Sequence, residues 1–318
     1  MRPLTILTTL LFIAFGSLLQ SCAKPESAPS IDVESIIAGL AQTESLLQSG
    51  KGHFKLYGDS YFRHGVEQLV EGVHTTKELG FAFSGKHSYF KYERLPEERQ
   101  LPSVAGFKPE LPPHEVSLES ISDGKIQLKI VLLGDNASPY ITMHPEPYNT
   151  STSKEPRNWG LWNRGQRMSA YLRELEGVRV MGSERINGIH CYILEASPPQ
   201  TQGVTEKFWI ASEGGFRLVQ RLIETRGDKR LIKIEWEHYQ LGEANVWFPK
   251  HGVSLSTTVG EKTPFRNEME INDFQPNIDV SSLFDLQISP ETQVFNADTR
   301  KHITFQEIGW QPLEKTSK

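Results

Sequence analysis

Hydrophobic and polar residues alternate through much of this chain, most clearly between Val178 and Glu224. The first alternating run ends at Asn187-Gly188, the dipeptide most typical of a type I′ hairpin turn, because both central residues of that turn need positive φ. Residues 189–196, 207–210 and 218–223 continue the pattern, and a Gly-containing turn lies between the last two runs. This region is therefore predicted to form consecutive antiparallel strands with one dry face.

Shorter alternating runs flank this region on both sides. They predict strands at residues 52–62, 72–83, 88–94, 120–133, 140–143, 231–239, 246–255 and 267–274. Two segments instead carry apolar residues at helical spacing and predict amphipathic helices at residues 32–48 and 164–175. Ser30 or Asp32 can cap the first helix, Gly50 would follow it, and Gly177 would end the second. The pattern predicts a mainly β (α+β) fold built on a single antiparallel sheet.

Two further segments lack a strand pattern. Residues 95–115 contain five prolines, which exclude a central strand or a long helix, so we expect a long loop. Loops of this length in compact domains tend to be functional or mobile, and a lid is one interpretation. The tail, residues 281–318, is expected to be irregular apart from a short strand near Val294.

Composition describes an ordinary globular chain of 318 residues, 37% hydrophobic and 23% charged, with room for a sizeable core. The formal net charge is −5 and no basic cluster stands out. Binding to nucleic acid phosphates needs concentrated Lys and Arg, so a nucleic-acid partner is not expected.

The N-terminus has the pattern of an export signal. Arg2 precedes an uncharged apolar run, Leu4 to Leu19, and the run ends in Leu19-Gln20-Ser21-Cys22. This ending resembles the bacterial lipobox. By that resemblance Cys22 would carry a diacylglycerol and an amide-linked acyl chain such as palmitate. A plain secretory signal or a single membrane anchor are the alternatives.

Lipidation would fix the location and the organisation of the mature chain. Several acyl chains give stable membrane attachment. Ala23 after Cys22 implies, by bacterial sorting rules, delivery to the periplasmic face of the outer membrane. We expect a signal peptide at residues 1–21, a lipidated tether at 22–30, a domain at 31–280 with the Pro-rich insertion, and a C-terminal extension at 281–318.

The sequence contains no local motif for catalysis, for a metal or for a cofactor. Its ten His residues form no HxH, HExxH or Cys-His pair, and GxSxG, P-loop and GxGxxG motifs are absent. Cys191 would be unpaired if Cys22 is lipidated, and it is read as a buried small hydrophobe rather than a nucleophile. Glu235 and Glu237 share one strand face, which indicates a solvated surface rather than an acid/base pair. We expect no cofactor and no enzymatic activity.

One extended motif adds a family resemblance. It consists of Asn-Gly-x-x-Cys/Tyr-x-Leu, followed by Phe-Trp-Ile-x-x-x-x-Gly-Phe-x-Leu-Val-x-Arg. Together with the export signal and the helix before the first strands, it resembles the LolA/LolB-like (RseB-like) lipoprotein-carrier superfamily over residues 33–274. The residues that carry it are Asn187, Gly188, Tyr192, Leu194, Trp209, Ile210, Gly215, Phe216, Val219, Arg221, Tyr239, Trp247 and Phe248.

The resemblance implies an open antiparallel β-barrel wrapped around helices, with an apolar cavity for acyl chains. The Pro-rich insertion and the tail are additions to that pattern. Strand alternation places about half of each strand's residues inward but does not say which face lines a cavity. An aromatic band at residues 81–92 fits either a sheet core or a ligand face. Candidate cavity residues are Phe81, Phe83, Phe90, Tyr192, Leu194, Trp209, Leu222 and Trp236.

Three functions remain open at this level. The first is a monomeric lipid-anchored periplasmic binding protein that holds an acyl chain or a lipoprotein, as a receptor or sensor rather than a soluble shuttle. The second is an envelope scaffold or interaction protein whose cavity is filled by its own helices. The third is a periplasmic hydrolase with a non-local catalytic set. A void of several hundred Å³ would favour the first, and a fully packed interior would favour the second.

Overall fold

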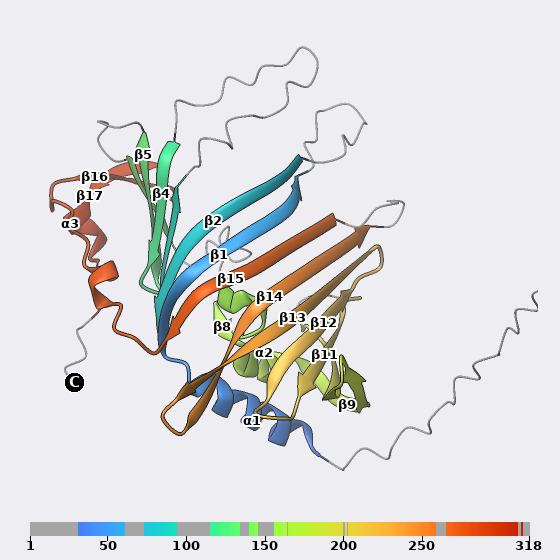
Figure 1. Ribbon diagram of the computed structural model, residues 1–318. Helices are drawn as coiled ribbons and strands as arrows, with labels where there is room; N and C mark the ends of the chain where they lie inside the picture. Colours follow the sequence, from blue (N-terminus) through green and yellow to red (C-terminus); the bar gives the residue numbers. More distant parts are fainter. Residues whose placement is uncertain are drawn as a thin grey trace, which may run out of the picture. The chain divides into compact units, whose positions relative to one another are not determined.

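The computed structural model of the protein describes residues 31–60, 73–93, 115–133, 140–145, 156–163, 165–199, 201, 203–258, 265–310 and 313 (Figure 1). The chain divides into two units, Met1–Ser30 and Ile31–Lys318. The expected signal peptide, Cys22, the tether and nearly all of the Pro-rich segment lie outside the described residues.

One curved sheet of fifteen strands dominates the described part of the chain (Figure 1). Its order is β17-β16-β6-β5-β4-β3-β2-β1-β15-β14-β13-β12-β11-β10-β9, and all neighbours are antiparallel except β16 and β6. The sheet is not closed into a barrel, because β17 and β9 stand at its two edges. The predicted fold class, a single open antiparallel sheet curved around a few helices, is confirmed.

The strands have these bounds: β1 (Ser49–Ser60), β2 (Val73–Ser84), β3 (His87–Glu93), β4 (Glu115–Ser122), β5 (Ile126–Leu133), β6 (Tyr140–Pro145), β9 (Glu176–Ile186), β10 (Ile189–Ser197), β11 (Thr205–Ala211), β12 (Arg217–Glu224), β13 (Asp228–Leu241), β14 (Ala244–Thr258), β15 (Phe265–Pro276), β16 (Gln293–Asn296) and β17 (Lys301–Thr304). A separate two-stranded ladder joins β7 (Trp162–Asn163) to β8 (Gln166–Arg167). The β9–β10 hairpin turns at Asn187 and Gly188, with φ of 48° and 83°, as the dipeptide predicted.

The first helix, α1 (Val33–Ser45), begins as predicted but ends early. Asp32 is its N-cap and accepts a 2.6 Å hydrogen bond from the Ser35 amide. At the other end, Asn277 donates to the Leu46 carbonyl oxygen at 2.7 Å and accepts from the Gln48 amide at 2.9 Å. The side chain of Asn277 thus supplies hydrogen bonds to backbone groups just after the end of α1. The chain then enters β1 at Ser49, and Gly50 does not end the helix.

The second predicted helix begins later than its apolar spacing suggested. α2 runs from Met168 to Glu174, because residues 166–167 pair with residues 162–163 instead of continuing the helix. Just before this ladder lies the 3₁₀ helix η2 (Pro156–Trp159). Gly177 has a positive φ of 62°, but it lies within β9 rather than after the helix.

Both α1 and α2 lie against the concave face of the sheet (Figure 1). One core cluster joins apolar residues of the two helices to inward-facing residues of β10–β13. A second, aromatic cluster joins η2 and the residues after it to β1, β2, β14 and β15. The helices and η2 therefore occupy much of the space inside the curve.

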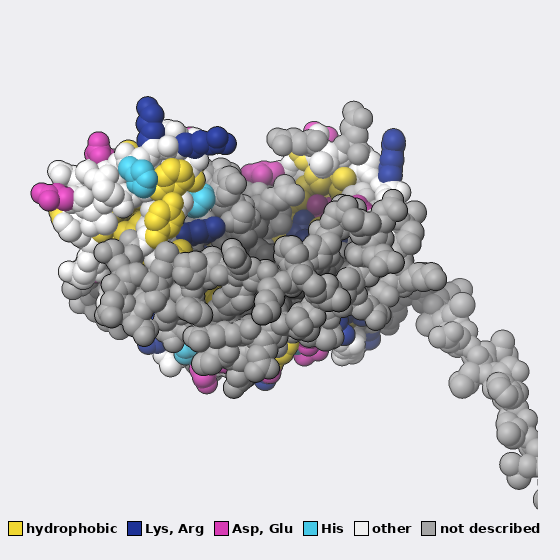
Figure 2. Space-filling view, turned by 90° about the horizontal axis from the view of Figure 1, so that it is seen from above, with side chains coloured by type: hydrophobic (Ala, Val, Ile, Leu, Met, Phe, Trp, Pro, Cys, Tyr) yellow, Lys and Arg dark blue, Asp and Glu magenta, His cyan; other side chains and the backbone are white. Residues whose placement is uncertain are grey.

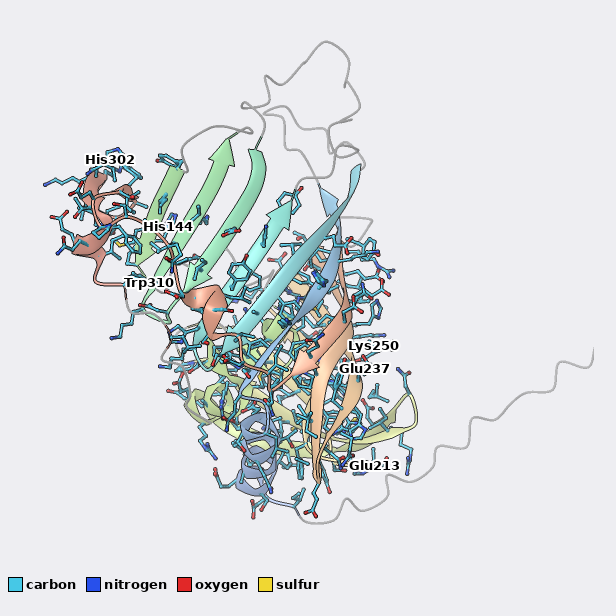
Figure 3. The ribbon with its side chains drawn as sticks, turned by 60° about the vertical axis from the view of Figure 1, so that its left-hand side comes forward. His144, Glu213, Glu237, Lys250, His302 and Trp310 are labelled. Carbon is cyan, nitrogen blue, oxygen red and sulfur yellow. The ribbon has the colours of Figure 1, made fainter. Side chains whose placement is uncertain are left out.

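The C-terminal tail is more regular than predicted. It contains the 3₁₀ helix η3 (Ser281–Phe284), the hairpin β16–β17 and the short helix α3 (Phe305–Ile308). Phe284 and Val294 are fully buried in it. The tail packs with Ala82 of β2, whereas Phe81 and Phe83 belong to the aromatic cluster, so the tail lies on the opposite face of the sheet. Figure 3 shows Trp310 beside η3, and its indole Nε1 donates to the Phe284 carbonyl oxygen.

Within the described ranges, no helix combines the length and the apolar composition needed to span a membrane.

Candidate ligand-binding site

Six of the eight candidate cavity residues lie on the concave face, in packed core. Phe81 and Phe83 each stack against Phe248, with ring centroids 5.9 Å apart, and Phe90 meets Phe54 edge to face. Tyr192, Leu194 and Trp236 belong to the cluster around α1 and α2, and the Trp236 indole donates to the Leu218 carbonyl oxygen at 2.7 Å. These residues hold the sheet to its helices, so the core interpretation of the aromatic band fits the structure.

Trp209 and Leu222 are not brought together with the other six. They form an outer cluster with Cys191 and Val219 on the opposite face of the sheet. The Trp209 indole donates a hydrogen bond to the Glu184 carboxylate there. Burial raises the pKa of the Cys191 thiol, so the residue behaves as the buried small hydrophobe expected from the sequence.

A β-bulge in β12 determines which of its residues face inward. Ile210 pairs with Leu218, but the next residue back, Trp209, pairs with Gln220, so β12 holds an extra residue at Val219. Such an insertion shifts the inward and outward faces of a strand by one residue. Leu218 faces inward before the bulge, and Arg221 rather than Leu222 faces inward after it.

Because Arg221 faces inward, it lines a cavity of about 650 Å³ beneath β11, β12 and β13. Its other walls come from η2, the β7–β8 ladder, α2 and the segment that follows β10. None of the eight candidate residues lines it. The volume lies within the range of small-molecule sites, roughly 300–1,000 Å³.

The cavity has an apolar side. Leu175 at the end of α2, Val204 before β11, and Ile223 and Ile232 on neighbouring strands contribute to it, with Pro198 after β10. Ile223 and Ile232 are only half-buried, so their surfaces are available to a ligand. Covering the remaining surface of a half-buried isoleucine stabilises a complex by about half of the roughly 1.5–3 kcal/mol that full burial gives.

The floor of the cavity is a buried polar network centred on Arg221. The Arg221 guanidinium donates to Glu206 Oε2 from Nε at 2.9 Å and from Nη2 at 2.5 Å. It also donates to Asn163 Oδ1 at 2.9 Å, and the Tyr171 hydroxyl donates to Glu206 Oε1 at 2.8 Å. Both charged side chains are over 90% buried. The network ties α2 and β7 to the sheet and leaves the paired charges satisfied.

Close packing fixes the wall formed by η2. Trp159 lies directly on Gly252 of β14, where an added Cβ would overlap the indole ring. Arg157, 2% exposed, stacks over Trp162 with its guanidinium carbon 3.9 Å from the ring centroid, and donates to the Gly85 carbonyl oxygen at 2.7 Å. The wall is therefore held by the close contact of Trp159 with the backbone of β14 and by the buried guanidinium of Arg157, rather than by a long helix.

A buried carboxyl group fixes α2 against α1. Glu44, 4% exposed, accepts hydrogen bonds from the Ser169 amide at 3.0 Å and from the Ser169 hydroxyl. Burial raises the pKa of Glu44 to about 7, although the two hydrogen bonds from Ser169 oppose this shift. The helix pair that supports the cavity thus contains a group that titrates near neutral pH.

Arg221 and Glu206 were not predicted as site residues. Arg221 entered the sequence analysis only through the family motif. A usable signal was present: each is a charged residue in a strand that also contains several large apolar residues, and the two strands are neighbours. Such charges mark either a solvated face or a buried polar site, and only the bulge decides between them.

In the described residues no group of three His, Cys, Asp or Glu side chains is placed to hold a metal ion.

Solved structures with a related arrangement include several envelope proteins. A LolA superfamily protein from Nitrosomonas europaea has 10% identity and a TM-score of 0.44, over 81% of this chain and 99% of that one. Lipoprotein LppX from Mycobacterium tuberculosis has 12% identity and a TM-score of 0.28, over 78% of this chain and 99% of that one. The Pseudomonas aeruginosa MucA/MucB complex gives 10% identity and a TM-score of 0.25, over 77% of this chain and 98% of that one.

No protein-family model and no curated protein matches this sequence. The structural likenesses are remote and carry no argument about function.

Proposed function

We propose that this protein is a non-enzymatic, lipid-binding protein of the bacterial cell envelope that holds an acyl chain in the cavity beneath β11–β13. The single observation that carries the proposal is a cavity of about 650 Å³ with an apolar side, which lies between the curved sheet and α2. A curved sheet whose concave face is only partly filled by helices leaves room for a ligand in place of core.

The N-terminal sequence supports the location. The pattern Leu19-Gln20-Ser21-Cys22 after an apolar run indicates lipidation of Cys22, and Ala23 indicates the outer membrane. An anchored protein at the periplasmic face would receive or sense an acyl chain, free or attached to a lipoprotein, from the membrane to which it is bound.

A second candidate function is an envelope interaction protein without a lipid ligand. The packing of Phe81, Phe83 and Phe90 into the aromatic core favours it, because the face expected to hold an acyl chain is filled by the protein itself. The two candidates differ in one respect: only a lipid-binding protein needs the cavity near Ile223 to stay open.

A substitution on β12 that reduces the volume of the cavity tests the proposal. Ile223→Trp places a large ring on the cavity side of β12, and we expect it to lower photo-cross-linking of a diazirine-labelled acyl chain to the full chain in phospholipid vesicles by about tenfold. Leu222→Trp is the matched control, because Leu222 is the adjacent residue on the opposite face. Equal labelling of both variants and the unsubstituted chain would contradict the proposal and favour the interaction protein.

A further inference from the structure

The two arginines that line the cavity differ in their partners. Arg221 is held by Glu206, Asn163 and Tyr171. Arg230, on the neighbouring strand β13, donates from Nε to Ser254 Oγ at 3.0 Å, and no carboxylate pairs with it among the described residues. An arginine side chain has five N–H donors in a fixed fork. Most of the donors of Arg230 are thus free for a ligand.

The strand register places Arg230 on the cavity side. It pairs with Ile223 of β12, and Ile223 shares its face with Arg221. The side chain as a whole is exposed, whereas Ser254, which holds its Nε, is 1% exposed. Although the residue as a whole is exposed, desolvation of the part of its guanidinium that is buried, and then the positive charge of Arg221, lower the pKa of Arg230.

Acidic residues near the cavity do not neutralise Arg230. Glu206 is taken up by Arg221, and Glu174 accepts a hydrogen bond from Gln166 Nε2 at 3.0 Å. Arg226, in the turn between β12 and β13, lies close to Gly203, beside the segment that closes this side of the cavity. Arg226 likewise has no carboxylate partner in the described part of the chain. Two arginines without a carboxylate partner among the described residues thus stand close to the apolar side of the cavity.

We infer that the ligand of this cavity is an anionic amphiphile, whose carboxylate or phosphate group binds the guanidinium of Arg230 while its chain lies against Ile223, Ile232 and Leu175. This inference rests on the proposed function and adds the chemical class of the headgroup. Arg matches both anions because two parallel N–H groups can contact two oxygens at once. The carboxylate of a fatty acid and the phosphate of an acidic lipid share this chemistry.

The test compares three photoactivatable probes that carry the same chain: a fatty acid, a monoalkyl phosphate and the neutral alcohol. Each is titrated against the full chain in phosphatidylcholine vesicles, and the cross-linked fraction gives the apparent affinity. We expect both anionic probes to bind about tenfold more tightly than the alcohol. Arg230→Gln should remove this preference and leave binding of the alcohol unchanged.

Lys229→Gln is the matched control. It removes the same charge at the neighbouring position, but Lys229 faces the other side of β13 and pairs with Glu224 at 2.7 Å. We expect it to leave the preference intact. Thermal unfolding of each variant shows whether the fold is retained.

The outcomes separate the two proposals. Equal binding of the three probes, unaffected by Arg230→Gln, would overturn the headgroup assignment and leave the acyl-chain proposal standing. Absence of specific labelling by any probe would overturn both. Displacement of the anionic probes by inorganic phosphate at similar concentration would show that the anion alone suffices, and would overturn the assignment of an amphiphile.

Discussion

At the scale of single residues, Glu44 is a buried carboxyl group whose pKa departs clearly from its ordinary value. It lies between α1 and α2, accepts from both the amide and the hydroxyl of Ser169, and is 4% exposed. Burial dominates and raises the pKa of Glu44 to about 7, whereas the positive charge of Arg167 has a smaller effect that favours the ionised carboxylate. The free energy of unfolding is therefore linked to pH through this carboxyl group.

We predict that the stability of the folded state decreases as the pH rises. The folded protein keeps the Glu44 proton up to about pH 7, whereas the unfolded chain releases it near its ordinary pKa of 4.5. The folded state thus binds more protons in this window, and its stability falls as pH rises through it. We expect Glu44 to contribute a loss of up to about 3 kcal/mol between pH 4 and pH 8.

Chemical denaturation of two variants at pH 5 and pH 8 measures this contribution. Glu44→Gln keeps a hydrogen-bonding side chain but cannot titrate, so it should flatten the pH dependence. Glu34→Gln, at an exposed position in the first turn of the same helix, should not. A pH dependence that is the same in both variants would show that Glu44 is not the group responsible.

At the scale of elements, α1 depends on a glycine for its contact with the sheet. Gly39 lies against the ring of Phe216, and an added Cβ would overlap that ring. Phe216 packs on the helix cluster, so the ring has little room to move. Glycine costs a helix up to about 1 kcal/mol relative to alanine, and here the close approach of α1 to the β11–β12 turn offsets that cost.

Gly39→Ala should therefore destabilise the protein by about 1–3 kcal/mol, even though alanine favours the helix. In a Phe216→Leu background the same substitution should cost less, because the overlap is relieved. A double-mutant cycle by denaturant unfolding measures this coupling between the two residues. Stabilisation by Gly39→Ala in the unsubstituted background would contradict the packing described.

The sequence predicts these elements well where local chemistry decides. The Asn187-Gly188 turn and the Asp32 cap follow from backbone requirements of a few adjacent residues. The end of α1 does not, because the side chain that caps it, Asn277, comes from a distant part of the chain. In the tail, β16 contains Val294 and confirms the short strand predicted there, whereas β17 was not predicted and forms by pairing with β16.

At the scale of the whole molecule, the sheet is predictable and the site is not. The alternation of apolar residues gives the strands and their hairpins, and most neighbours in the sheet are consecutive in the sequence, except that β1 pairs with β15 and β6 pairs with β16. Which face becomes core, and which part of the concave side stays open, depends on the bulge at Val219 and on where α1, α2 and η2 settle. Trp209 and Arg221 illustrate this: the bulky residue faces outward and the charged one faces the cavity.

The described hydrophobic side chains also gather in two separate places when the molecule is seen from above (Figure 2). Near β13 and β14, Figure 3 shows Glu237 and Lys250 close together, and they form a 3.5 Å ion pair. His144, on β6, lies in the other half of the sheet, far from the cavity residues of β11–β13.

The central claim is that the cavity beneath β11–β13, and not the aromatic core, holds an acyl chain. The most direct measurement is peptide mapping of the full chain after photo-cross-linking to a diazirine-labelled fatty acid. We predict adducts in the peptides that contain Leu175, Val204, Ile223 and Ile232. Adducts confined to the peptides of Phe81–Phe90 or Phe248, with none at these cavity residues, would contradict the claim.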